Sequence, residues 1–324
     1  MPNIVVLSGG VGGSRFARGL RAAAPNAQLT VIVNTGDDVS LHGLRISPDV
    51  DTVLYALAGL VDDRRGWGPR GDSFRCMDQL ERLGGETWFR LGDLDLALHL
   101  RRTELLAIGL TPSQVTAELA LRLGIQHVRI LPMTDHPVET WVQLADGPHG
   151  EWVHFQDYFV KRRADVAIRG VRLNGHDQAR PAPGVLDALG HADLVALAPS
   201  NPFVSLGPIL AIAGVREAVV AARARGAVVA GVSPLIGGAT VKGPAARMLV
   251  ELGHEPSALG VAVQYAGLLD WFMIDPVDRE LAPRLRALGV RLIVADALMR
   301  GRRGEARLAR RLLSAVLRPG SRVR

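Results

Sequence analysis

The sequence of 324 residues predicts an α/β fold with a doubly wound, mostly parallel sheet of the Rossmann-like kind. Short β-branched runs at residues 3–8 and 29–34 are separated by a helix of the length that a parallel βαβ unit requires. Between the first run and the helix lies the glycine turn, Ser8-Gly9-Gly10-Val11-Gly12-Gly13-Ser14-Arg15. Glycines let backbone N–H groups approach a phosphate, and a helix N-terminus adds favourable charge there. We therefore expect a nucleotide or another phosphorylated ligand at this turn.

The glycine turn departs from both common nucleotide-binding motifs. A dinucleotide fingerprint would need glycine where Arg15 stands, and a P-loop would end in Gly-Lys-Ser or Gly-Lys-Thr. The second strand also ends without the lone acid that binds a ribose, which argues against an NAD-dependent oxidoreductase. The motif taken alone is also compatible with a tight turn that binds no ligand, which is the alternative to a phosphate-binding loop.

Helices are expected to follow the second strand. Thr111 and Pro112 provide the N-cap and the first-turn proline of one of them. His99 lies on another, between leucines, where a structural histidine is expected. A buried strand is predicted at residues 127–131. The expected helices cover residues 52–61, 77–83, 94–108 and 112–123.

Residues 136–180 interrupt the α/β alternation and are predicted to form an insertion. Two β-type runs at residues 140–144 and 151–155 flank residues 145–150, which contain Asp-Gly and Pro, the chemistry of a hairpin turn. Residues 165–173 favour one more strand. The alternation then resumes, so residues 1–324 are expected to form a single α/β domain. The remaining elements are predicted at residues 193–198, 227–232, 245–252, 269–274, 277–288 and 291–295.

The net charge of +6 is a local property of the C-terminal segment. Residues 300–324 hold nine arginines and the single acid Glu305, with leucine and valine at helical spacing. This pattern predicts a basic amphipathic helix with a solvated charged face, with an anionic partner as the alternative. Aromatic residues do not interleave with the arginines as base stacking requires, so no nucleic acid is expected.

Several features predict a cytoplasmic protein without a membrane segment. The longest apolar region, residues 194–219, contains Pro199, Pro202 and Pro208, which a membrane-spanning helix tolerates poorly. No basic stretch followed by an apolar one opens the chain. Cys76 is the only cysteine, which excludes an internal disulfide and a cysteine zinc site, and we expect it to be a small buried hydrophobe.

Four polar loops follow predicted strands and should meet at one edge of the sheet, because parallel strands point the same way. The two glycine-rich loops offer backbone N–H groups, with Arg15 and Lys242 as phosphate counter-charges. Ser200 and Asn201 are suited to reading a base or ribose edge, with a helix cap as the alternative. The loops comprise residues 9–14, 34–38, 199–201 and 233–243.

Asp37, Asp38, Asp49 and Asp51 place four carboxylates within fifteen residues. Such a cluster repels itself unless a hard divalent cation bridges carboxylate and phosphate oxygens, and magnesium is the natural candidate. Asp49 and Asp51 are two residues apart and would project to one side of an extended segment. The alternatives are an N-cap role for Asp51 and turn roles for Asp37 and Asp38.

Further motifs follow the glycine turn in order along nearly the whole chain. They are Asn34-Thr35-Gly36-Asp37-Asp38, His42-Gly43-Leu44-Arg45, Ser47-Pro48-Asp49-Val50-Asp51-Thr52, Arg90-Leu91-Gly92-Asp93, Leu131-Pro132-Met133-Thr134-Asp135, His154-Phe155-Gln156-Asp157-Tyr158, Ser200-Asn201-Pro202 and Ser233-Pro234-Leu235-Ile236-Gly237-Gly238. As a set they resemble the 2-phospholactate/phosphoenolpyruvate transferases of coenzyme F-420 biosynthesis.

The resemblance implies a magnesium-dependent, homodimeric transferase. Such an enzyme moves a phospho-three-carbon acid from a guanosine-diphospho donor to the deazaflavin Fo (7,8-didemethyl-8-hydroxy-5-deazariboflavin) and releases GMP. The resemblance also implies that Asp51 and Arg90 contact Fo. The family often has lysine at the position of Arg90, so arginine keeps the charge there with a different geometry.

The residues and the resemblance together give one set of site predictions. Asp37 and Asp49 are predicted to hold magnesium, and Asp49 and Asp51 to serve catalysis, with Asp51 orienting or deprotonating the acceptor hydroxyl. The competing hypothesis is a nucleotide-sugar-binding regulator without catalysis, and phospholactate, phosphoenolpyruvate and phosphoglycerate all stay open as the carried acid. The predicted substrate-binding residues are Gly10, Gly12, Gly13, Ser14, Asn34, Asp51, Arg90, Ser200, Asn201, Gly237, Gly238 and Lys242.

Overall fold

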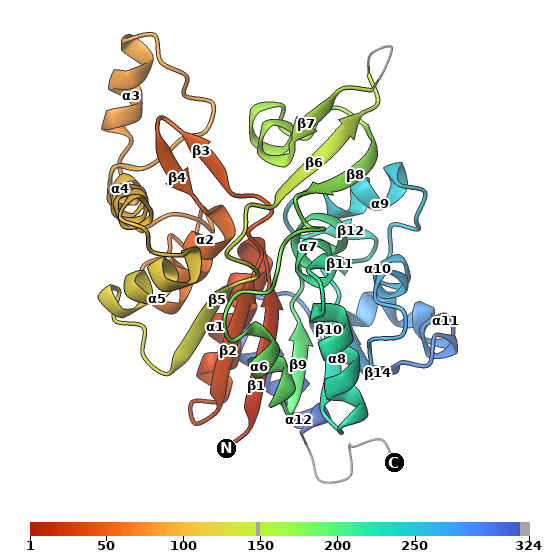
Figure 1. The fold of residues 1–324 in the computed structure, drawn as a ribbon. Coiled ribbons are helices and arrows are strands. Elements are labelled where there is room, and N and C mark those ends of the chain that lie inside the picture. The colour runs from red at the N-terminus through yellow and green to blue at the C-terminus, as the bar shows by residue number, and fades with distance from the viewer. Residues whose placement is uncertain (147–149, 318–324) are drawn as a thin grey trace.

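A seven-stranded parallel sheet forms the centre of the computed structural model, which describes residues 1–146 and 150–317 (Figure 1). The strand order β14-β13-β10-β9-β1-β2-β5 runs outward from β1 in both directions, as a doubly wound sheet requires. The predicted fold class is therefore confirmed. The strands are β1 (Asn3–Ser8), β2 (Gln28–Val33), β5 (Val128–Pro132), β9 (Leu194–Leu197), β10 (Val228–Val232), β13 (Trp271–Ile274) and β14 (Arg291–Val294).

Helices cover both faces of the sheet, because successive side chains of a strand point to opposite faces. In β1, Ile4 and Val6 belong to one apolar cluster, whereas Val5 and Leu7 belong to the other. The first face is covered by α1 (Gly10–Ala23), α2 (Pro48–Leu57), α4 (Asp93–Ala107), α5 (Pro112–Arg122) and α12 (Gly301–Val316). The opposite face is covered by α6 (Val185–Gly190), α7 (Gly207–Ala211), α8 (Val215–Ala224), α9 (Ala245–Glu251), α10 (Ala258–Gln264) and α11 (Ala282–Ala287).

Smaller units lie beyond the carboxyl ends of the strands (Figure 1). Between β5 and β9 the chain forms an antiparallel sheet of β6 (Glu139–Leu144), β7 (Trp152–His154) and β8 (Ile168–Asn174), followed after β7 by the π-helical turn η1 (Asp157–Lys161). Its apolar face packs on Met248 of α9. On the other side lie the hairpin of β3 (Val39–Leu41) and β4 (Leu44–Ile46), and α3 (Arg75–Arg82). A short hairpin joins β11 (Leu235–Ile236) to β12 (Ala239–Thr240).

Several local expectations differ from the structure. The helix predicted at residues 52–61 begins at Pro48, which suits the first turn because its missing N–H has no partner there anyway. The helix predicted at residues 277–288 is the 3-10 turn η3 (Pro276–Leu281) followed by α11. Cys76 is exposed on α3 rather than buried. The hairpin turn predicted within residues 145–150 falls mainly on residues 147–149, outside the described residues.

The C-terminal helix α12 packs along α1. Leu308, Leu312 and Val316 are buried, whereas the arginines of the helix are exposed. A Cβ atom on Gly19 of α1 would lie 2.5 Å from the Glu305 carbonyl oxygen, so the two helix backbones are in close contact. The predicted helix extended to residue 324, and its last residues, 318–324, lie outside the described part of the chain.

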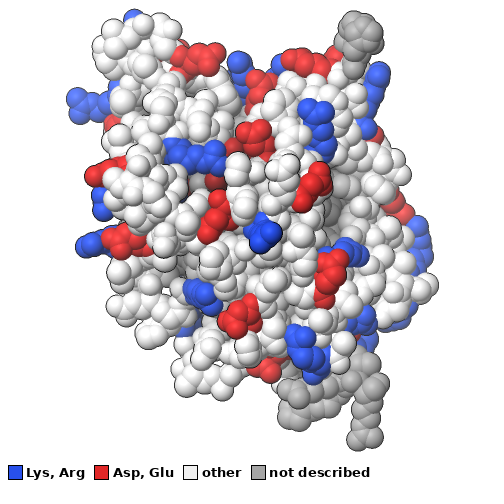
Figure 2. Space-filling view, viewed as in Figure 1, with Lys and Arg blue, Asp and Glu red and all other residues white. Residues whose placement is uncertain are grey.

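The surface carries no continuous basic patch on the face shown in Figure 2, where positive and negative side chains are interspersed. Among the described residues, no single helix has both the length and the apolar composition to cross a membrane. Residues Pro202–Ala211 and Val215–Ala224 meet these criteria only as a pair, which is bent by 81°.

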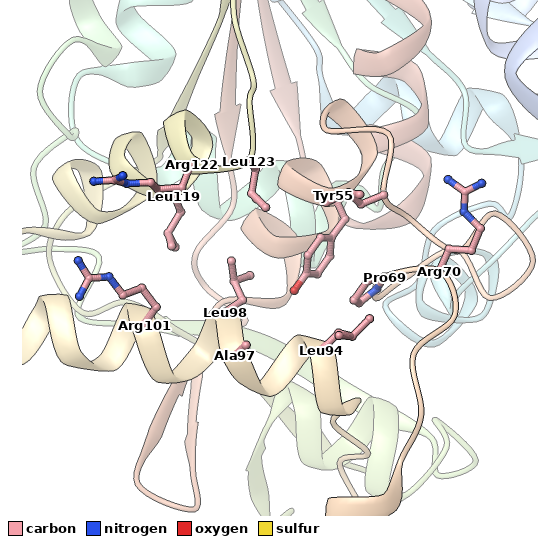
Figure 3. Close-up of a pocket in the computed structure, with 11 residues that line it drawn as sticks. Tyr55, Pro69, Arg70, Leu94, Ala97, Leu98, Arg101, Leu119, Arg122 and Leu123 are labelled. Carbon is pink, nitrogen blue, oxygen red and sulfur yellow. The ribbon is translucent and has the colours of Figure 1, made fainter.

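A cavity of about 410 Å³ opens between α2, α4 and α5, with Tyr55 at its edge (Figure 3). Apolar side chains such as Leu98 and Leu119 form most of its wall. None of the residues predicted to bind substrate or metal lines this cavity.

Candidate functional site

Three of the four predicted loops meet at the carboxyl ends of the strands. The Ser200 hydroxyl, after β9, donates a 2.7 Å hydrogen bond to the carbonyl oxygen of Gly9, after β1. The Asn34 amide, after β2, donates to Asp49 Oδ2 at 3.0 Å. The backbone N–H of Gly10 donates to Asp49 Oδ1 at 2.7 Å. The glycine turn, the acidic loop and the loop after β9 therefore share one rim.

Close packing explains why the turn is rich in glycine. A Cβ atom on Gly12 would lie 2.2 Å from the Pro199 carbonyl oxygen, and one on Gly13 would lie 2.4 Å from Ser8 Oγ. Gly10 has a φ of 64°, in the left-handed region that glycine adopts without strain. Glycine thus lets α1 begin in direct contact with the neighbouring loops.

Burial raises the pKa values of the acids on this rim. Burial is the main cause at Asp37, and the charge of Asp49 adds to it, so the pKa of Asp37 lies well above its usual range. Burial raises the pKa of Asp49 to about 6, against the opposing hydrogen bonds from Asn34 and Gly10. Burial raises the pKa of Asp38 to about 7, although the Arg45 charge opposes it. A cation beside these carboxylates would favour their ionised forms.

The rim offers oxygen ligands that suit a divalent cation. Asp37 Oδ1 and Asp38 Oδ1 are buried without a hydrogen-bond partner among the described residues. Oxygen donors of this kind match Mg²⁺, which is commonly held by one or two carboxylates, with waters and substrate phosphates as the remaining ligands. No group of three or more acids, histidines or cysteines in the described chain is arranged to hold a metal. The carboxylates suit a divalent cation by ligand type, and a magnesium ion at this rim stays a prediction.

Asp51 points away from Asp49, and the interpretation of the two as neighbours in an extended segment is wrong. Both lie in the first turn of α2. Two residues on a helix are separated by about 200° around its axis, so their side chains leave on opposite sides. Asp49 faces the glycine turn, whereas Asp51 faces α4.

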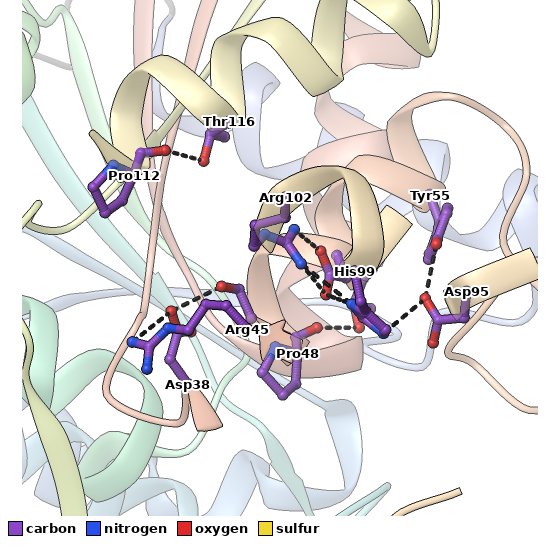
Figure 4. A network of polar contacts seen from close by, with 12 residues as sticks. Asp38, Arg45, Pro48, Tyr55, Asp95, His99, Arg102, Pro112 and Thr116 are labelled. Atoms are coloured by element: carbon purple, nitrogen blue, oxygen red, sulfur yellow. Dashed lines mark hydrogen bonds and ion pairs between the residues drawn. The ribbon is translucent and has the colours of Figure 1, made fainter. Parts of the chain in front are cut away.

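A buried polar network joins Asp51 to α4 (Figure 4). Both oxygens of Asp51 accept hydrogen bonds from the Arg102 guanidinium. His99 Nδ1 lies 3.3 Å from Arg102 Nη1, and His99 Nε2 lies 3.4 Å from Asp95 Oδ1. The Tyr55 hydroxyl donates to the same Asp95 oxygen at 2.7 Å. Sequence reasoning missed Arg102, although the spacing of Asp95, His99 and Arg102 places them on one face of α4.

Arg90 lies on the segment between α3 and α4. Its guanidinium forms a 2.6 Å ion pair with Asp78 and lies 5.2 Å from the ring centre of Phe74. In the described part of the chain, these contacts do not reach the glycine turn or the rim acids. A contact between Arg90 and the acceptor stays a prediction.

Lys242 lies beside the N-terminal part of α1, whereas Gly237 turns toward another element. The Lys242 ammonium donates to the Arg65 carbonyl oxygen, and burial together with the Arg15 charge lowers its pKa. The Gly237 N–H instead donates to Asp278 of η3 at 3.0 and 3.2 Å. An added Cβ atom on Gly66 would lie 2.9 Å from Val11 Cγ1 and 3.0 Å from Lys242 Nζ, so the Lys242 ammonium lies near the glycine turn.

The side chains of Ser14 and Asn201, two of the predicted substrate-binding residues, have local partners. The Ser14 hydroxyl donates to the Val11 carbonyl oxygen at 3.0 Å. Asn201 Oδ1 accepts from the Phe203 N–H at 2.9 Å and caps the π-helical turn η2 (Pro202–Leu206). Asn201 therefore has the role of a helix cap, which was the alternative prediction. Gly238 is a separate case: an added Cβ atom there would lie 3.1 Å from the Pro256 carbonyl oxygen.

The β6–β8 sheet contributes residues that sequence reasoning did not place in the site. The Thr140 N–H donates to the Gly36 carbonyl oxygen at 2.6 Å, and the Gln156 amide donates to the Asp37 carbonyl oxygen at 3.5 Å. Thr140 Oγ1 and His154 Nε2 are buried atoms without a hydrogen-bond partner among the described residues. The motif around His154 was the signal that pointed to this segment.

A doubly wound sheet whose strand ends carry a glycine turn and buried acids is typical of α/β proteins that bind their ligands at the carboxyl edge. The chain belongs to the family of the 2-phospho-L-lactate transferase CofD, whose model matches residues 4–305. The resemblance inferred from the motifs is therefore confirmed, and the chain is an enzyme of a transferase family that acts on small molecules.

Relatives match the chain over nearly its whole length. A phosphoenolpyruvate transferase from Streptomyces coelicolor is 45% identical over 313 residues, which are 96% of this chain and 97% of that protein. The 2-phospho-L-lactate transferase from Methanosarcina acetivorans is 40% identical over 296 residues, 91% of this chain and 93% of that protein. A solved structure of a Bacillus halodurans protein has a TM-score of 0.64 at 20% identity and covers 98% of this chain and 99% of that one, which supports the fold.

Proposed function

We propose that this transferase moves a phospho-three-carbon acid from a guanosine-diphospho donor to the deazaflavin Fo and releases GMP, as a step of coenzyme F-420 biosynthesis. We propose phosphoenolpyruvate as the acid, with 2-phospholactate as the second candidate. Relatives named phosphoenolpyruvate transferase are 43 to 45% identical, and those named 2-phospho-L-lactate transferase are 37 to 40% identical. The enzyme is proposed to act as a cytoplasmic homodimer.

The observation that carries the proposal is the junction between Asp49 and the glycine turn. A phosphorylated ligand at the N-terminus of α1 would lie next to the Asp49 carboxylate, because the Gly10 N–H is 2.7 Å from Asp49 Oδ1. An anion and a carboxylate so close together repel each other unless a cation lies between them. The same junction therefore supports both a diphosphate ligand and a shared magnesium ion.

We assign Asp37 and Asp49 as the residues that would hold Mg²⁺, with Asn34 orienting Asp49. When bound, the ion would withdraw charge from the phosphoryl oxygens of the donor. Backbone N–H groups at the start of α1 and the Lys242 ammonium hold the guanylate phosphates. Gly10 leaves room for the donor, because an added Cβ atom there would meet only Asp49 Oδ1 at 3.9 Å. Gly12, Gly13 and Ser14 contribute by holding the turn in its packed form.

The proposed reaction is a phosphoryl-type displacement in which positioning is the main contribution of the protein. A hydroxyl oxygen of Fo forms a new bond to the phosphorus that carries the three-carbon acid. The bond from this phosphorus to the bridging oxygen breaks, GMP leaves with the electron pair, and the hydroxyl proton passes to solvent. Asp51 and Arg90 orient the acceptor. Both oxygens of Asp51 already accept hydrogen bonds from Arg102, so we propose that Asp51 orients the hydroxyl rather than removes its proton.

The decisive experiment incubates purified protein with Fo, magnesium and one of three synthetic donors, which carry enolpyruvyl, lactyl or glyceryl groups. Mass spectrometry then detects the product. We expect a new mass equal to Fo plus one phospho-acid, with the largest yield from the enolpyruvyl donor, and GMP in equal amount. The absence of any Fo adduct with all three donors would contradict the proposal. Calorimetric binding of a uridine diphosphate sugar without binding of Fo would instead support a non-catalytic regulator.

A further inference from the structure

The two acids in the first turn of α2 have different surroundings. Asp49 contacts the glycine turn and Asn34, whereas Asp51 is held by the guanidinium of Arg102 on α4. The side chains of Asp51 and Arg102 are 6% and 4% exposed, so water contributes little to the pair. A guanidinium that donates from two nitrogens to two carboxylate oxygens fixes the plane and the rotation of the carboxylate.

His99 in turn contacts Arg102, and Asp95 lies on the far side of His99. The side chain of His99 is 1% exposed and lies between the two, with Nδ1 3.3 Å from Arg102 Nη1 and Nε2 3.4 Å from Asp95 Oδ1. Tyr55 closes the network, because its hydroxyl donates to Asp95 and it lies one helical turn after Asp51 on α2. Arg102 and His99 of α4 thus both lie against Asp51, whereas His99 Nε2 has no hydrogen-bond partner among the described residues.

Stability alone gives little physical reason for such a network. Well-packed apolar residues of similar volume often stabilise a fold as well as a buried ion pair does, because the pair loses its hydration. A buried pair does differ from an apolar contact in one respect, since it fixes the orientation of charged groups. Arg102 also attracts Asp38 on the acidic loop, so its charge acts on two of the four acids found between residues 37 and 51.

We infer that Arg102, supported by His99, is the positioning residue of Asp51 in the transfer reaction. It holds the Asp51 carboxylate on the side of α2 that faces α4. Asp49 lies about 200° away around the helix axis and is left to the donor side of the site. Asp51 is thereby held ready for the acceptor. This inference rests on the proposed function, and it predicts that loss of Arg102 affects use of the acceptor more than use of the donor.

The test compares Arg102→Gln and Arg102→Lys with wild type, with separate kcat and KM values for Fo and for the donor. We expect Arg102→Gln to lower kcat/KM for Fo by about a hundredfold, which is the effect of losing one hydrogen bond to a charged group. The KM of the donor should change less than threefold. Arg102→Lys should recover part of the loss. In an Asp51→Asn background, Arg102→Gln should cause less than a threefold further loss, because it acts through Asp51.

Arg223 provides the matched control. Its Nε donates at 2.6 Å to the buried carboxylate of Asp270, near β13 and away from the rim. Arg223→Gln should lower the melting temperature without a selective change for Fo. If Arg102→Gln does not fold, His99→Gln takes its place, with a smaller loss in the same parameter expected.

The possible outcomes distinguish failure of the proposed function from failure of the role inferred for Arg102. If wild type transfers nothing to Fo, the proposed function fails and this inference fails with it. If wild type is active, but Arg102→Gln keeps full kcat/KM for Fo or loses use of donor and acceptor equally, the function stands and the inference is overturned. Additive losses in the Asp51→Asn background would overturn it as well.

Discussion

Asp49 and Gly10 are joined by a 2.7 Å hydrogen bond that connects the first turn of α2 to the first turn of α1. The bond brings a carboxylate to the positive end of a helix dipole, where an anion is stabilised. It also makes the geometry of the site depend on close packing of the glycine turn. Four predictions follow from this arrangement and from the packing around it.

Gly12→Ala should destabilise the protein, because its Cβ atom would lie 2.2 Å from the Pro199 carbonyl oxygen, a backbone atom that cannot move by itself. We expect the free energy of unfolding to fall by about 3 kcal/mol, as for an overpacked core site. Urea unfolding monitored by circular dichroism measures it. Gly190→Ala is the control, since no atom lies within 4 Å of its added Cβ, and it should change stability by less than about 1 kcal/mol. Equal effects of the two substitutions would contradict the packing argument.

Asp37→Asn should stabilise the magnesium-free protein and abolish its response to magnesium. Burial and the Asp49 charge raise the pKa of Asp37, so its ionised form is disfavoured at neutral pH and a neutral amide of the same shape removes this penalty. We expect a gain of about 1 kcal/mol in the free energy of unfolding in EDTA, at the cost of activity. Magnesium should raise the melting temperature of wild type by ligand linkage but not that of the variant.

Asp296→Asn serves as the control for Asp37→Asn, because Asp296 is a half-exposed partner of Arg307 and lies outside the rim. This variant should keep the magnesium response of wild type. A magnesium-induced rise in melting temperature that survives in Asp37→Asn would exclude Asp37 as a ligand. Full turnover of Asp49→Asn at limiting magnesium would exclude Asp49 in the same way.

Lys242→Ala should weaken binding of the donor, because the ammonium is the positive charge that the fourth loop brings beside α1. We expect the KM of the guanylated donor to rise about tenfold, as for one lost hydrogen bond to a charged group, with the KM of Fo unchanged. Lys161→Ala is the control, since the other lysine of the chain pairs loosely with Glu86 and Asp157 at 3.9 Å. A rise in the KM of Fo instead would place Lys242 on the acceptor side.

Glu305→Gln should destabilise the contact between α12 and α1. Glu305 is buried and accepts two 2.8 Å hydrogen bonds from Arg18, so loss of its charge leaves the largely buried Arg18 guanidinium with Asp63 as its remaining anionic partner among the described residues. We expect a loss of about 3 kcal/mol, typical of a buried pair that loses one member. Glu118→Gln, which breaks the exposed pair with Arg122, should cost less than about 0.5 kcal/mol. Similar melting temperatures of the two variants would contradict this account.

The strands and the rim could be predicted because they depend on local patterns. The β-branched runs that became β1 and β2 carry their own propensity, and the glycine turn between them marks the point where the chain must pass close to its neighbours. Parallel strands bring their carboxyl ends together whatever lies between them, so contact of Gly10 with the loop near Asp49 follows from topology. The helix start at Pro48 was missed, because the spacing of Asp49 and Asp51 fits an extended segment as well as a first turn.

The partners of the charged residues were decided only by the tertiary structure. The sequence by itself determined the sheet, the glycine turn, the acidic loop and the family to which their motifs belong. It did not determine that Asp51 faces Arg102, that Asn201 caps a helical turn or that Glu305 of α12 pairs with Arg18 of α1. Strand and helix propensities act over a few residues, whereas the burial of a charge depends on which elements pack against it. Asp51 and Arg102 are 51 residues apart in the sequence, and Arg18 and Glu305 are 287 residues apart.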